Sequence, residues 1–113
     1  MNRAGARAED LCAQMLRRAG PRILARNWHC RHGEIDLVAE DEGTLVFAEV
    51  RLRRSDRYGG AAESVTHAKR QRLLAAARLY LAGRKEVNCR FDVLLLDGAQ
   101  EPEIQWIRGA FEE

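Results

Sequence analysis

The chain of 113 residues is nearly neutral, with 19 Lys and Arg against 17 Asp and Glu and a formal charge of +2. This length supports one hydrophobic core, so residues 1–113 are expected to form a single domain, which excludes a two-domain enzyme. The sequence has neither an apolar stretch of about 18 residues nor an apolar N-terminal segment, so it predicts a cytoplasmic protein without a membrane partner. The 3 scattered cysteines are expected to be reduced thiols.

Basic residues are concentrated in the middle of the chain. Residues 51–72 carry 7 basic and 2 acidic side chains, whereas residues 1–50 carry 7 and 8 and residues 73–113 carry 5 and 7. Such a segment can attract the phosphates of a nucleic acid, although a solvated helix face and loop would show the same pattern. The candidate nucleic-acid-binding residues are Arg53, Arg54, Arg57, Lys69, Arg70 and Arg72.

The first half of the chain predicts one helix followed by three strands. Apolar residues recur at helical spacing from about residue 4 to residue 19, and Gly20 ends the pattern. A short strand is expected over residues 22–28. Residues 34–40 and 44–52 are rich in Ile, Val, Leu and Phe and flank a short polar turn, which predicts a β-hairpin.

The second half predicts a polar loop over residues 53–63 and then a helix that is capped by Ser64 or Thr66 and ends near Gly83. A buried strand over residues 91–96 and a weaker edge strand over residues 104–107 follow. The complete order is therefore αβββαββ. A mixed sheet flanked by helices is the layered arrangement that such an order favours, so the fold class is α/β.

The predicted hairpin brings carboxylates from two strands together. Because side chains alternate along a strand, Glu34, Asp36 and Val38 are expected on one face, with Ile35 and Leu37 on the other. One register of the hairpin gives the pairs Glu40–Leu45, Val38–Phe47, Asp36–Glu49 and Glu34–Arg51. A register shifted by two residues would instead place Asp36 opposite Phe47.

In the first register, two directly opposed carboxylates would repel each other unless a positive group lies between them. Mg²⁺ binds one or two carboxylates together with water and phosphate oxygens, so Asp36 and Glu49 are candidate ligands for Mg²⁺, with Mn²⁺ as the alternative. The competing interpretation is that these acids form ion pairs with arginines on a solvated face.

Several segments carry a family resemblance that covers nearly the whole chain. They are GEIDLV at 33–38, LVFAEVR at 45–51, RFDV at 90–93 and GAF at 109–111. Together they resemble the YraN-like family of uncharacterised bacterial proteins. That family in turn resembles the PD-(D/E)xK nuclease superfamily, which implies a three-layer, restriction-endonuclease-like core with αβββαβ order.

The resemblance implies roles for individual residues. Asp36 corresponds to the first metal-binding Asp of the nuclease motif and Glu49 to the acid of its E-x-K half, and both are implied metal ligands. Glu9 lies on the first helix, where related junction-resolving nucleases carry a further acid, and it or Glu34 would hold outer-shell waters. The implied activity is Mg²⁺-dependent hydrolysis of phosphodiester bonds in nucleic acid, with DNA expected as the partner.

This sequence departs from the superfamily pattern at Arg51, where a lysine is expected. Arginine keeps the positive charge but cannot accept a proton, and its planar fork differs in shape from an ammonium group. Three alternatives stay open: Arg51 supports the reaction, Lys69 replaces the missing lysine, or the domain binds nucleic acid without cleaving it. A protein-interaction domain that pairs through the edge strand at residues 104–107, for example in a homodimer, is a further alternative.

Overall fold

The computed structural model describes residues 3–53, 66–97 and 102–111. The elements are α1 (Arg3–Ala19), β1 (Arg22–Cys30), β2 (Gly33–Asp41), β3 (Thr44–Arg53), α2 (His67–Leu81), β4 (Cys89–Asp97) and β5 (Ile104–Phe111). This order confirms the predicted succession of two helices and five strands. Most of the loop expected over residues 53–63 lies outside the described residues.

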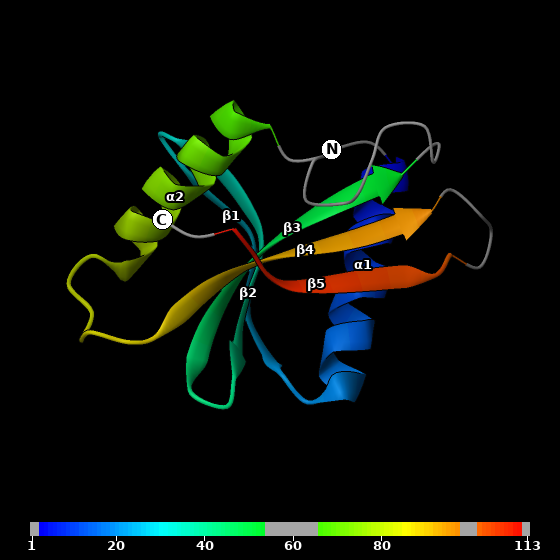
Figure 1. Ribbon diagram of the computed structural model, residues 1–113, viewed down its shortest axis with the longest axis horizontal. Coiled ribbons are helices and arrows are strands. Elements are labelled where there is room, and N and C mark those ends of the chain that lie inside the picture. Colours follow the sequence, from blue (N-terminus) through cyan, green and yellow to red (C-terminus); the bar gives the residue numbers. More distant parts are fainter. Residues whose placement is uncertain (1–2, 54–65, 98–101, 112–113) are drawn as a thin grey trace.

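The five strands form one mixed sheet in the order β1-β2-β3-β4-β5. Strands β3 and β4 are parallel, and the other neighbours are antiparallel. Because parallel neighbours need a long connection, the chain crosses from β3 to β4 through α2. The two helices lie on opposite sides of the twisted sheet (Figure 1), and β5 lies at an edge, as predicted. No helix in the described residues is long and apolar enough to cross a membrane.

Each face of the sheet carries its own apolar cluster. On the α2 face, Phe47 packs edge-on against Tyr80 and stacks with Phe91, with ring centroids 5.7 and 5.6 Å apart. On the α1 face, Cys12 and Leu16 lie among buried residues of β2, β3 and β4. Burying one large apolar side chain contributes roughly 1.5–3 kcal/mol, so these two clusters fix both helices on the sheet.

Local sequence explains where the helices start and end. The N–H of Gly20 donates to the carbonyl of Leu16 at 3.1 Å, and its φ of 125° ends α1 in a conformation that glycine favours. Thr66 caps α2, because its hydroxyl accepts a hydrogen bond from the N–H of Lys69 at 3.2 Å. Thr66 is one of the two predicted caps, and the other, Ser64, lies outside the described residues.

The hairpin adopts the first of the two predicted registers. Glu40 pairs with Leu45 and Val38 with Phe47, and the pairing continues only as far as Leu37 with Ala48. Asp36 and Glu49 are therefore the next two residues beyond the end of the ladder.

The expected alternation of side chains along β2 is wrong at Ile35. Ile35 packs with Val38 in the cluster on the α2 side, whereas Leu37 packs on the α1 side. The regular pleat is interrupted at this point, because pairing with β3 begins only at Leu37 and because Asn27 of β1, between the partners of Leu37 and Ile35, has a left-handed backbone. As a result, Glu34 reaches the carboxylates of Glu9 on α1 and Asp36.

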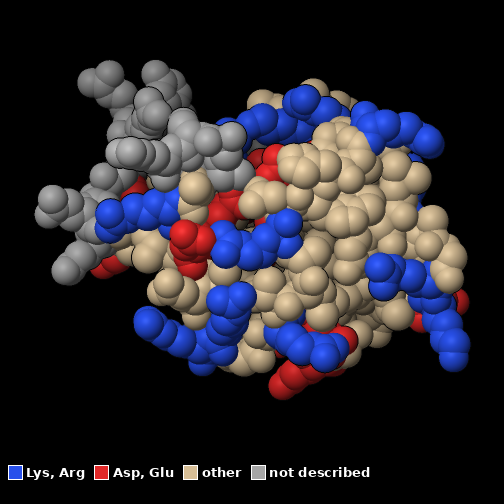
Figure 2. All heavy atoms as spheres, turned by 180° about the vertical axis from the view of Figure 1, so that it is seen from behind, with Lys and Arg blue, Asp and Glu red and all other residues tan. Residues whose placement is uncertain are grey.

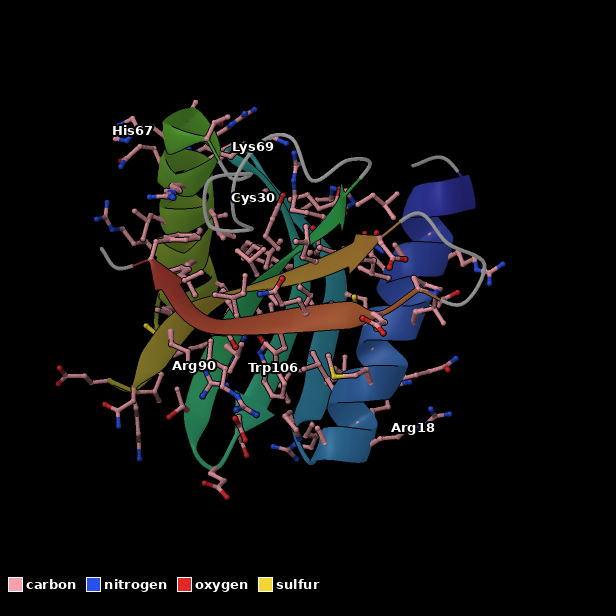
Figure 3. All side chains as sticks on the ribbon, turned by 45° about the vertical axis from the view of Figure 1, so that its right-hand side comes forward. Arg18, Cys30, His67, Lys69, Arg90 and Trp106 are labelled. Carbon is pink, nitrogen blue, oxygen red and sulfur yellow. The ribbon has the colours of Figure 1, made fainter. Side chains whose placement is uncertain are left out.

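A buried carboxylate on β4 connects this strand to β5. Asp92 is fully buried and accepts hydrogen bonds from Arg90 Nε at 3.1 and 3.2 Å, from Trp106 Nε1 at 2.8 Å and from the N–H of Gly109 at 2.9 Å. Arg90 also binds Asp41 at 2.9 Å, and it lies beside Trp106 in Figure 3. The RFDV segment thus has a structural role, because it connects β4 to β5 and to Asp41 at the end of β2.

Candidate functional site

A cavity of about 190 Å³ lies at the first residues of β2, beyond Leu37 and Ala48, the pair of β2 and β3 that is farthest from the turn. The first turns of α2 form its other side, and Figure 3 shows Lys69 near the start of that helix. The lining combines acidic and basic groups: His32, Gly33, Glu34, Asp36, Glu49, Lys69, Arg72 and Leu73.

Asp36 and Glu49 form the centre of the acidic side. Asp36 Oδ2 accepts a hydrogen bond from the N–H of Val50 at 2.8 Å, and the carboxyl groups of Asp36 and Glu49 are hydrogen-bonded to each other. Burial raises the pKa of both groups, and burial together with the charge of Asp36 raises the pKa of Glu49 to about 7. Near neutral pH the pair can therefore hold a proton between two groups that are ordinarily both ionised.

A second convergence of acids joins α1 to β2. One carboxylate oxygen from each of Glu9, Glu34 and Asp36 lies within 4.8 Å of the others. Glu9 is only 2% exposed, and burial, followed by the charges of Asp36 and Glu34, raises its pKa to about 7. Within the described part of the chain, Oε1 of Glu9 and Oε1 of Glu34 are buried and have no hydrogen-bond partner. Buried oxygens without a donor are costly, so this cluster suits a positive group.

The donor set indicates which positive group fits. All the converging ligand atoms are carboxylate oxygens, which are the ligands of Mg²⁺ and Mn²⁺ rather than of softer metals. A divalent cation would also remove the mutual repulsion that contributes to the raised pKa of Glu9. The residues present therefore fit a hard divalent cation.

Basic side chains border this acidic cluster. Arg51 Nη1 lies 3.8 Å from Glu49 Oε1, and its side chain is 30% exposed. The positive charges of Arg51 and Lys69 both act to lower the pKa of Glu49, against the effects of burial and of Asp36. Lys69 and Arg72 are three residues apart and therefore lie on the same side of α2. The cavity thus has carboxylates from the sheet on one side and cations from α2 on the other.

The structure brings together the four acids that the sequence indicates, Glu9, Glu34, Asp36 and Glu49, and places Arg51 beside them. The outer-shell role expected for Glu9 or Glu34 stays a prediction, and both residues place a carboxylate oxygen within 4.8 Å of Asp36.

The six candidate nucleic-acid-binding residues do not all lie at the cavity. Lys69 and Arg72 line the cavity, whereas the guanidinium of Arg70 lies over the ring of Phe111, 5.4 Å from its centroid. Arg53 is the last residue of β3, and Arg54 and Arg57 lie outside the described residues. Arg70 faces away from Lys69 because consecutive residues on a helix project about 100° apart.

Two residues at the site were not identified from the sequence. His32 lines the cavity, and Asn27 lies near Glu9 and acts to lower its pKa. The pairing of Cys30 with Gly33 at the turn between β1 and β2 explains both positions, because it carries His32 to the mouth of the cavity and sets Asn27 across from Asp36. A prediction of that register was the one signal that could have found them.

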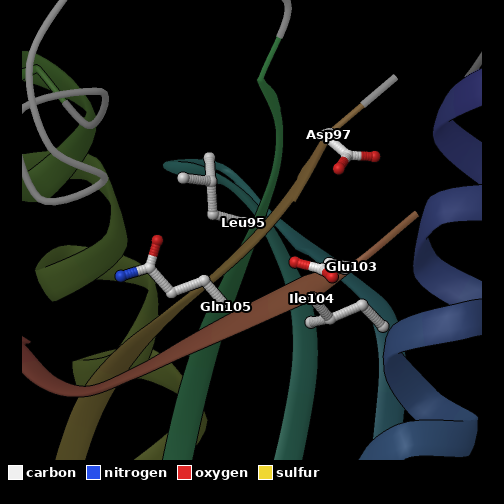
Figure 4. A pocket seen from close by; sticks show the side chains of 5 residues that line it. All are labelled: Leu95, Asp97, Glu103, Ile104 and Gln105. Atoms are coloured by element: carbon white, nitrogen blue, oxygen red, sulfur yellow. The ribbon is translucent and has the colours of Figure 1, made fainter. Parts of the chain in front are cut away.

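A larger hollow of about 350 Å³ lies on β4 and β5. Its lining residues, shown in Figure 4, are Leu95, Asp97, Glu103, Ile104 and Gln105. This set contains two acids and no basic side chain, so it offers no complement to a phosphate group. On the surface seen from behind, basic side chains are spread widely and acidic side chains lie among them in several places (Figure 2). Charge complementarity therefore favours the smaller cavity.

Comparison with known proteins finds similar sequences in other organisms. The pattern of the family described as "Uncharacterised protein family UPF0102" matches residues 8–96. A UPF0102 protein of Nitrosomonas europaea is 50% identical over 110 residues, covering 96% of this chain and 93% of the relative. Relatives from Dechloromonas aromatica and Pseudomonas aeruginosa are 47% and 46% identical, covering 95% and 96% of this chain and 87% and 91% of their own lengths. The matched segment contains all the acids and cations that line the cavity or converge at Asp36.

Proposed function

The chain belongs to the UPF0102 family, the YraN-like family that its sequence segments resemble, and we propose that it is a metal-dependent nuclease that binds nucleic acid, DNA in particular, and hydrolyses phosphodiester bonds. The observation that carries this proposal is the convergence of Glu9, Glu34 and Glu49 on Asp36, with buried unpartnered oxygens on Glu9 and Glu34. Three of these four acids line a cavity that Lys69 and Arg72 also line. Charges of both signs in one small cavity are what a cation and a phosphate together require.

The fold supports a placement in the PD-(D/E)xK superfamily. Its central hairpin carries Asp36 and Glu49 at the end of the ladder between β2 and β3, with α1 and α2 on opposite faces of the sheet. The order of the first six elements, αβββαβ, is that of a restriction-endonuclease-like core.

The acids would hold a divalent cation. Asp36 and Glu49 would be ligands, and Glu9 and Glu34 would complete the set of oxygen donors. When bound, Mg²⁺ or Mn²⁺ supplies Lewis-acid polarisation of a phosphate and makes water a better nucleophile near neutral pH. The N–H of Val50 orients Asp36 through a hydrogen bond of 2.8 Å to its Oδ2.

The cations on α2 would contact the substrate. Lys69 and Arg72 face the acids across the cavity, where a phosphate of the nucleic acid would be attracted to both. Lys69 carries a compact ammonium, whereas Arg51 beside Glu49 retains its protons too tightly to relay one. Lys69 therefore takes the part of the lysine that the superfamily pattern expects at Arg51, and Arg51 supports the negative charge that develops on the phosphate.

A cleavage assay tests this function. The full-length protein would be incubated with labelled linear, nicked, flapped and branched DNA and with RNA, in Mg²⁺, in Mn²⁺ and in EDTA. Metal-dependent cleavage of at least one DNA is expected, with a loss of roughly 10²-fold in Lys69→Ala, a magnitude typical of removing one charged group that stabilises a transition state. Arg70→Ala is the matched control, because Arg70 is the neighbouring residue on α2 but packs over Phe111.

Two results would contradict the proposal in different ways. Salt-sensitive binding without cleavage in either metal would indicate a nucleic-acid-binding module that is not an enzyme. The absence of both binding and cleavage would remove nucleic acid as the partner.

A further inference from the structure

Asn27 has an unusual backbone for a residue within a strand. Its φ is 50°, and among the described residues other than glycine only Glu42, with a φ of 51°, shares this left-handed region. Glu42 lies in the turn between β2 and β3, where such a conformation is normal. Asn27 lies inside β1, where it interrupts the extended chain. Asparagine tolerates this region better than most residues, but strain of this kind concentrates at functional sites.

The register of the sheet places this irregularity at the acidic cluster. Arg26 pairs with Leu37 and Trp28 with Ile35, so Asn27 lies across from Asp36. Its side chain lies near the buried carboxylate of Glu9 and acts to lower the pKa of that group. Asn27 thereby connects β1 to the one acid of the cluster that comes from a helix.

The two ends of the carboxamide have different environments. Oδ1 of Asn27 is buried and has no partner among the described residues, and the amide NH₂ is the only group of this side chain that can donate to a carboxylate. The unpartnered Oδ1 is the third buried oxygen of this kind in the described residues, and the other two belong to Glu9 and Glu34. An asparagine therefore supplies a donor to one carboxylate and a further oxygen without adding another negative charge.

We propose that Asn27 is a positioning residue of the metal centre, whose left-handed backbone directs its amide to Glu9 and holds that carboxylate near Glu34 and Asp36. This inference rests on the proposed function, because it requires a cation to bind among these acids. Groups that orient metal ligands in this way typically contribute 10–100-fold to metal affinity.

Replacement by glycine tests the contribution of the Asn27 side chain separately from that of its backbone conformation. Asn27→Gly removes the carboxamide but accepts a positive φ without strain, so β1 keeps its path. Glu42→Gly is the matched control, because it relieves the same backbone conformation in the exposed turn of the hairpin. The wild type and both variants would be compared by thermal melting without metal and by calorimetric titration with Mn²⁺.

Both glycine variants are expected to melt at or above the wild-type temperature, and Asn27→Gly alone is expected to bind Mn²⁺ at least about 10-fold more weakly. Wild-type affinity in Asn27→Gly would overturn the inference and leave the proposed function intact. A fall in melting temperature for Asn27→Gly but not for Glu42→Gly, with Mn²⁺ affinity lost in parallel, would indicate a structural role and also overturn it. If the wild type binds no Mn²⁺, the proposed function fails together with this inference.

Discussion

Asp36 and Glu49 share a hydrogen bond at the position where the ladder between β2 and β3 has just ended. A carboxyl group can donate to a carboxylate only if one of the two is protonated, and the raised pKa values of both groups make this possible near neutral pH. A cation bound between them would take the place of that proton. Protonation and metal binding are therefore expected to compete at this site.

The stability of the metal-free protein should fall as the pH rises from 5 to 8. The pKa of Glu9 and of Glu49 is raised from 4.5 to about 7 on folding, so the neutral groups favour the folded state at low pH and this contribution is lost as the pH rises through about 7. Glu49→Gln should flatten the fall in melting temperature over this range, and saturating Mn²⁺ should reverse it. A melting temperature that does not change or that rises without metal would contradict the expectation.

Asp36→Asn should abolish cleavage and weaken metal binding while the protein stays folded. The amide oxygen can still accept the hydrogen bond from the N–H of Val50, but the charge that attracts a cation is gone. We expect no cleavage, Mn²⁺ affinity lower by about 100-fold, and a metal-free melting temperature that rises by about 4 °C for each kcal/mol of repulsion removed.

Glu40→Gln is the control for this charge removal, because Glu40 lies on β2 like Asp36 but forms an exposed ion pair with Arg22 of β1. This substitution should leave all three measurements unchanged. Normal cleavage by Asp36→Asn would rule out Asp36 as a ligand.

Arg51→Lys should raise the cleavage rate, since an ammonium at this position is compact and can exchange a proton. If Lys69 performs this role in the natural sequence, the loss caused by Lys69→Ala should be smaller in the Arg51→Lys background than in the wild type. The measurement is a double-mutant cycle on single-turnover rates. Strictly additive effects would mean that the two residues act independently.

Asp92→Ala should destabilise the fold without altering the site. The buried carboxylate accepts hydrogen bonds from Arg90, Trp106 and Gly109, and its removal would leave these donors without a partner at a cost of roughly 3–5 kcal/mol in the free energy of unfolding. Asp41→Ala removes one partly exposed partner of Arg90 and should cost about 1 kcal/mol or less.

Urea denaturation measures both of these values, and Mn²⁺ titration of the folded Asp92→Ala protein should give wild-type affinity. Equal costs for the two substitutions would mean that Asp92 does not organise the junction of β4 and β5.

The order of the elements was predictable because it follows from local pattern, whereas the hairpin register was one of two that the sequence left open. Apolar periodicity identified the order of the elements, and the polar turn after Glu40 is compatible with the observed pairing of that residue with Leu45. The different positions of Lys69 and Arg70 could also have been read from the helical phase of buried Leu73 and Leu74.

Other features depend on tertiary structure. The approach of Glu9 to Glu34 depends on how α1 packs across the sheet, and the side that Ile35 takes depends on where the ladder stops. The backbone conformation of Asn27 has no signal in the sequence, because asparagine is compatible with strands, turns and loops alike.

The position of a cation would test the proposed metal centre most directly. Crystals of the wild-type protein would be soaked in Mn²⁺, and anomalous differences would be collected near the manganese absorption edge. We predict one peak at roughly 2.0–2.3 Å from carboxylate oxygens of Asp36 and at least one of Glu9, Glu34 and Glu49. A fully soaked crystal without a peak at these acids, or with peaks only elsewhere on the molecule, would contradict the metal centre and with it the proposed hydrolysis.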